Sequence, residues 1–102
     1  MIRVGLVGCG HIGAAHALAI TELGAAGLVD ARLVAVTDRD PERAERFAAR
    51  HDARAFPDVA ALVAEVDAVW ICTWTSGHRE AVEIAAAWNS RARGDRIAWS
   101  LV

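Results

Sequence analysis

Three glycines near the N-terminus are spaced so that they could hold a phosphate. The segment Gly8-Cys9-Gly10-His11-Ile12-Gly13 follows the apolar run Ile2–Val7 and opens an alanine-rich stretch. In a G-x-G-x-x-G turn between a strand and a helix, the first glycine permits the tight turn. The second lets the backbone approach a pyrophosphate, and the third lets the helix pack closely on the strand. The helix N-terminus adds N–H groups and partial positive charge, so the segment predicts a phosphate-binding loop.

A carboxylate at the end of the next apolar run supplies the second half of this pattern. Asp38 follows Ala31–Thr37, which has the composition of a buried parallel strand. A carboxylate there can accept hydrogen bonds from both hydroxyls of an adenosine ribose and would repel a 2′-phosphate, which favours NAD. Arg39 could instead stack on adenine or meet a 2′-phosphate, so NADP stays an alternative. Asp38 could also simply cap the next helix, although Asp40-Pro41 supplies a better cap.

Composition narrows the class of protein. The length of 102 residues indicates one domain. The net charge of −2 and the scattered arginines give no indication of a nucleic-acid partner. The chain contains no lysine, so no lysine general acid or Schiff base is available. Cys9 and Cys72 lack metal or CxxC spacing and are expected to be buried thiols, with a redox pair as the alternative. The uncharged stretch Val4–Thr21 is broken by glycines and histidines, so we expect a soluble, cytoplasmic protein without a membrane partner.

Apolar runs and helical spacings alternate along the chain. Strands are expected at Ile2–Val7, Ala31–Thr37, Ala53–Phe56 and Asp67–Thr73, and helices at His11–Leu23, Pro41–Arg50, Val59–Ala64 after Asp58, and from about His78. This alternation predicts an α/β fold with a doubly wound parallel sheet in the order 3-2-1-4, which a fifth strand could extend. Ligands bind such sheets at the carboxyl ends of the strands. The glycine loop, Asp38 and the loop 73–78 should therefore surround one crevice.

Three of these stretches together resemble the N-terminal domain of the glucose–fructose oxidoreductase and inositol dehydrogenase family (Gfo/Idh/MocA). They are residues 2–13 with His16 following, residues 36–44, and residues 67–73 with His78 opening the next helix. The resemblance covers roughly residues 1–87. It implies a Rossmann domain that binds NAD or NADP, in an oxidoreductase that acts on sugars, polyols or related small molecules.

The resemblance also implies roles for individual residues. The backbone around Gly10, His11 and Ile12 would hold the pyrophosphate, Asp38 and Arg39 would meet the adenosine end, and Thr73, Trp74 and His78 would line the nicotinamide side. Trp74 departs from the family, which commonly has proline there. It could stack on a ring or cap the crevice.

The family pattern stops after Ala87. Members continue with a Glu-Lys-Pro motif, whose lysine contacts cofactor and substrate, and with a C-terminal α/β domain that carries the substrate pocket. Here residues 88–102 form a divergent tail without lysine, in which Arg96–Val102 could make a makeshift strand. We therefore expect a dinucleotide-binding domain over residues 1–87 of a truncated, catalytically incomplete oxidoreductase, with no catalytic residue of its own. The alternative is a free-standing nucleotide-binding or interaction module that pairs with a separate catalytic chain.

Overall fold

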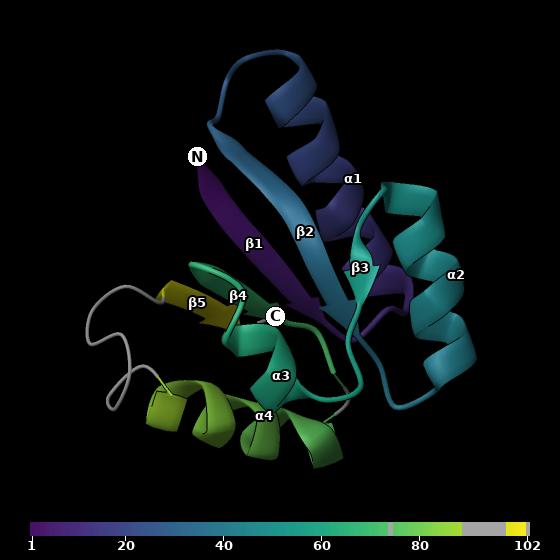
Figure 1. Ribbon diagram of the computed structural model, residues 1–102, viewed down its shortest axis with the longest axis vertical. Helices are drawn as coiled ribbons and strands as arrows, with labels where there is room; N and C mark the ends of the chain where they lie inside the picture. The colour runs from purple at the N-terminus through teal and green to yellow at the C-terminus, as the bar shows by residue number, and fades with distance from the viewer. Residues whose placement is uncertain (74, 89–97, 102) are drawn as a thin grey trace.

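The chain folds around a parallel sheet of five strands in the order β3-β2-β1-β4-β5 (Figure 1). The computed structural model describes residues 1–73, 75–88 and 98–101, and the side chains of residues 1–73 and 79–87. Its elements in chain order are β1 (Ile2–Val7), α1 (His11–Ala25), β2 (Ala31–Thr37), α2 (Pro41–His51), β3 (Arg54–Ala55), α3 (Val59–Val63), β4 (Ala68–Ile71), α4 (Thr75–Trp88) and β5 (Ala98–Leu101).

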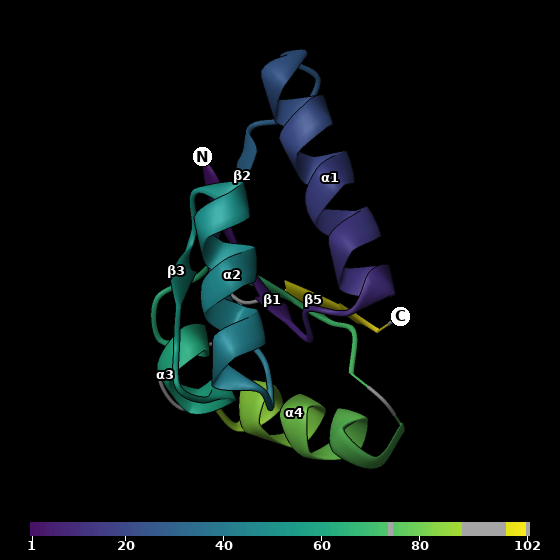
Figure 2. The same ribbon diagram turned by 90° about the vertical axis from the view of Figure 1, so that its right-hand side faces the viewer.

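Helices cover both faces of this sheet (Figures 1 and 2). One apolar cluster joins Leu6 and Val36 of the sheet to Ile20 of α1 and Phe47 of α2. The second cluster lies on the opposite face and joins the strands to α3 and α4; it includes Val7, Leu62, Val69, Ile71, Ala81 and Ala85. Successive strand residues point to opposite faces, so strands buried on both sides need continuous apolar runs. This requirement explains the composition of β1 and β2.

The predicted doubly wound order 3-2-1-4 is confirmed, and the fifth strand that the sequence left open is present as β5, which pairs in parallel with β4. The prediction for α4 was wrong by a few residues, because the helix begins at Thr75 rather than near His78. Gly77 lies in that first turn, and glycine's low helix propensity makes such a start hard to recognise from sequence. Within the described ranges, no helix has both the length and the apolarity needed to cross a bilayer.

Candidate dinucleotide-binding site

A cavity of about 560 Å³ opens at the carboxyl ends of β1, β2 and β4. It is lined by Gly8, Gly10, His11, Ile12, Asp38, Arg39, Asp40, Arg43, Cys72 and Thr73. The fold thus brings together most of the residues that the sequence singled out, because the segments that carry them follow the ends of β1, β2 and β4. Gly13 lies beneath the loop rather than in the cavity wall. Trp74 and the side chain of His78 lie outside the described part of the chain.

The three glycines of the loop are required for different reasons. Gly8 has a φ of +99°, and a Cβ there would lie 2.7 Å from the carbonyl oxygen of Cys72. A Cβ on Gly13 would collide with the carbonyl oxygen of Gly8. A Cβ on Gly10, by contrast, would meet no atom within 4 Å. The fold therefore needs glycine at positions 8 and 13, whereas Gly10 leaves open space at the wall of the cavity.

The first turn of α1 borders that open space. Its N-cap is Gly10, which has no side chain to cap the helix, and its first turn carries no acidic residue. In contrast, Asp40 caps α2 and Asp58 caps α3 through side-chain hydrogen bonds. The first N–H groups of a helix have no partner within the helix, so an uncapped N-terminus beside a cavity can accept an anion.

Asp38 is held at the floor of the same cavity. Its Oδ2 accepts a 2.7 Å hydrogen bond from the Cys9 N–H, and its Oδ1 accepts a 2.9 Å bond from the Asp40 N–H. Its side chain is 8% exposed, and the Arg43 Nη1 lies 3.7 Å from Oδ1. Since Asp40 is the N-cap of α2, Asp38 does not cap that helix. A carboxylate has about four acceptor positions, so capacity for further donors remains.

Sequence reasoning missed Asp40 and Arg43 as cavity residues. The available signal was the Asp40 cap itself. A cap at the cavity rim places the first turn of its helix there, and Arg43 lies in that turn. The Arg43 guanidinium adds positive charge to the cavity wall, and its side chain is half exposed.

The two cysteines behave as structural thiols. Both are free; Cys9 is buried and Cys72 is half-buried. Burial raises the pKa of Cys9 to about 12, and the nearby charge of Asp38 adds to this shift. Burial also raises the pKa of Cys72. Thiols with raised pKa values stay protonated and are poor nucleophiles.

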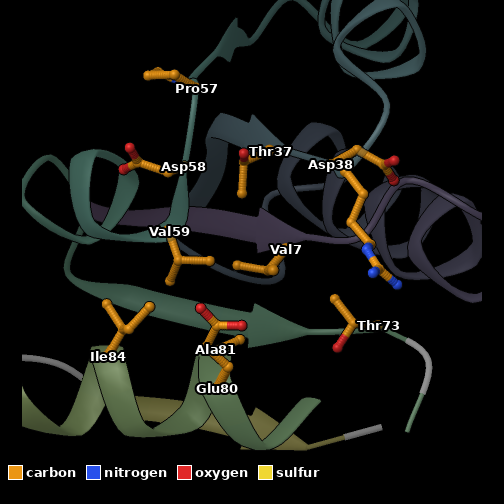
Figure 3. A pocket seen from close by; sticks show the side chains of 11 residues that line it. Val7, Thr37, Asp38, Pro57, Asp58, Val59, Thr73, Glu80, Ala81 and Ile84 are labelled. Atoms are coloured by element: carbon orange, nitrogen blue, oxygen red, sulfur yellow. The ribbon is translucent and has the colours of Figure 1, made fainter. Parts of the chain in front are cut away.

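A smaller cavity of about 240 Å³ adjoins the first one (Figure 3). The two cavities share Asp38, Arg39 and Thr73. The rest of the smaller cavity is lined by Val7, Thr37, Pro57, Asp58, Val59, Glu80, Ala81 and Ile84, which are mostly apolar. One crevice therefore runs from the glycine loop past Asp38 to an apolar chamber between α3 and α4.

Comparison with known proteins identifies relatives among sugar and polyol dehydrogenases. UDP-N-acetylglucosamine 3-dehydrogenase of Acidithiobacillus ferrooxidans is 43% identical over 84 residues, which are 82% of this chain and 25% of that protein. Inositol 2-dehydrogenase of Rhizobium meliloti is 41% identical over 83 residues, 80% of this chain and 24% of the relative. This chain thus spans about a quarter of the length of these relatives.

Solved structures agree with this relationship. Myo-inositol dehydrogenase from Lactobacillus casei, solved with NAD(H) and myo-inositol, superimposes with a TM-score of 0.76 at 32% identity over 85% of this chain and 26% of the other. A family model described as "Oxidoreductase family, NAD-binding Rossmann fold" matches residues 2–91. The chain therefore belongs to the Gfo/Idh/MocA oxidoreductase family and corresponds to its NAD-binding Rossmann domain.

Proposed function

We propose that this chain binds a nicotinamide adenine dinucleotide, NAD(H) in preference to NADP(H), within a cytoplasmic oxidoreductase of sugars, polyols or related small molecules. The observation that best supports this proposal is the open space at Gly10, which lies in front of the uncapped N-terminus of α1 and in the same cavity as Asp38. A pyrophosphate needs close backbone approach, and an adenosine ribose needs a nearby acceptor. The relatives that act on inositol and on a UDP-sugar support the substrate class.

Each part of the crevice then has a role. The N–H groups of His11 and Ile12 bind the pyrophosphate, and the Arg43 guanidinium offsets its charge. Asp38 accepts the ribose hydroxyls, with Arg39 beside the adenosine. The family resemblance implies that Thr73, Trp74 and His78 line the nicotinamide side. When bound, the nicotinamide supplies hydride transfer, and these residues bind and orient it.

We assign this cofactor-binding role to residues 1–87 and no catalytic side chain to them. By this proposal the chain is catalytically incomplete, and a small-molecule substrate is bound only if a second domain completes the enzyme. Binding of the cofactor and turnover of the substrate are then separate properties, and the first can be measured on the 102-residue chain alone.

Cofactor preference tests the proposal directly. Calorimetry should show that the chain binds NAD at least about tenfold more tightly than NADP, because the Asp38 charge repels a 2′-phosphate. Asp38→Asn should narrow this preference to about threefold or less, because it removes the charge while its single oxygen still accepts from one of the two N–H groups.

Asp30→Asn is the matched control. It removes the same charge at an 85% exposed side chain, at the opposite end of β2, and should leave the preference unchanged. Tighter binding of NADP than of NAD by the unmodified chain would contradict the assignment of Asp38. No binding of either dinucleotide would contradict the proposed function itself.

A further inference from the structure

The chamber that adjoins the glycine-loop cavity has apolar walls that suit a purine base. Val7 and Ala81 are both 3% exposed and contribute apolar surface, with half-buried Val59 and Ile84 beside them. A flat heteroaromatic base gains from burial against such a surface. This inference rests on the proposed function. If Asp38 holds the adenosine ribose, the base on that same ribose enters the chamber that shares Asp38 with the loop cavity.

Glu80 is the charged side chain that α4 contributes to this chamber. Figure 3 shows its carboxylate directed from α4 towards Val7 and Val59. Asp58, the other carboxylate beyond the shared residues, points away from this group in the same view, and its Oδ1 already accepts from the Ala61 N–H at 2.8 Å. Glu80 has no hydrogen bond or ion pair with any side chain that the structure describes, whereas Glu83 on the same helix pairs with Arg79.

A carboxylate in this position selects bases by the group they carry at position 6. Adenine has an amino group there, which donates hydrogen bonds, whereas guanine and hypoxanthine carry a carbonyl oxygen, which accepts them. An ionised carboxylate only accepts. We propose that Glu80 accepts a hydrogen bond from the exocyclic amino group of adenine and thereby makes this site specific for adenine dinucleotides over 6-oxopurine dinucleotides.

The test compares NAD with nicotinamide hypoxanthine dinucleotide, in which an oxygen replaces that amino group. Calorimetry should show that the 102-residue chain binds NAD at least about tenfold more tightly than the analogue. Glu80→Gln should reduce this ratio to about threefold or less, because an amide can accept from the amino group and also donate to the oxygen.

Glu83→Gln is the matched control, since it makes the same change one turn further along α4, outside the cavity wall. It should keep the wild-type ratio, and thermal unfolding should show that both variants fold. Equal binding of NAD and the analogue by the wild type, or an unchanged ratio in Glu80→Gln, would overturn the role of Glu80 and leave the proposed function standing. Absence of NAD binding by the wild type would overturn both.

Discussion

At the scale of single residues, two glycines of the loop are needed for folding and the other, by our proposal, is needed for ligand binding. Gly8 and Gly13 are fixed by backbone contacts within the protein itself. Gly10 faces open space at a φ of −84°, which other residues adopt without strain. A side chain at position 10 would thus harm a ligand rather than the fold.

This separation gives a paired prediction. Gly10→Val should lower the affinity for NAD by at least about thirtyfold while circular dichroism stays native, because the side chain fills the space for the pyrophosphate. Gly13→Ala should instead destabilise the fold by about 1–3 kcal/mol, the usual cost of overpacking, because its Cβ meets the Gly8 carbonyl. Urea unfolding and calorimetry measure the two effects. Undiminished NAD affinity in a folded Gly10→Val variant would mean that the loop does not cradle a phosphate.

At the scale of elements, the helices that border the crevice begin in two different ways. α1 begins without a side-chain cap, which leaves its N-terminus for an anion. α2 begins at Pro41 behind Asp40, whose Oδ1 accepts from the N–H groups of Glu42 at 3.1 Å and Arg43 at 3.4 Å. A cap of this type stabilises the helix directly, so α2 holds Arg43 at the rim independently of a ligand.

Removal of that cap should cost stability. Asp40→Ala should lower the free energy of unfolding by about 1 kcal/mol, whereas Asp40→Asn, which keeps a capping oxygen, should change it by only a few tenths of a kcal/mol. Urea denaturation with a shared m-value compares the two variants. Equal losses in both would show that the Asp40 charge, rather than the hydrogen bonds of the cap, stabilises α2.

At the scale of the whole molecule, the composition makes the alkaline stability unusually simple to interpret. The chain contains neither lysine nor tyrosine. In the pH range above the pKa of the N-terminal amine and below the pKa of arginine, the two cysteines are therefore the side chains that titrate. The pKa of Cys9 is raised from 9.0 to about 12 in the folded state. The folded protein therefore holds this proton where the unfolded chain has released it.

The sign of the resulting pH dependence follows from linkage. The native state binds more protons than the unfolded state between about pH 9 and 12, so stability falls as the pH rises through this window. Cys9→Ala should flatten this decline, and Cys72→Ala should flatten it less. Urea unfolding at a series of pH values measures the slope. A slope that is the same with and without the Cys9 thiol would show that its burial does not control the alkaline stability.

Local sequence patterns determined the elements and their order. The runs that form β1 and β2 are long, apolar and bounded by glycine or aspartate, and alternation with helical segments leaves few topologies for a parallel sheet. The loop between Val7 and His11 could likewise be predicted, because strand, glycines and helix are contiguous. The start of α4 was predicted a few residues too late, because Gly77 in its first turn has a low helix propensity.

Only the tertiary structure decided what surrounds Asp38. The pairing of β1 with β2 sets Val7 opposite Thr37, so the residues that follow each strand meet although they are distant in sequence. This register lets the Asp38 carboxylate accept a hydrogen bond from the Cys9 N–H and places the Arg43 guanidinium beside that carboxylate. Glu80 reaches the neighbouring chamber by the same kind of non-local placement, through packing of α4 on the sheet. Such contacts cannot be predicted from the spacing of side chains along the chain, because they arise from strand register and helix packing rather than from local periodicity.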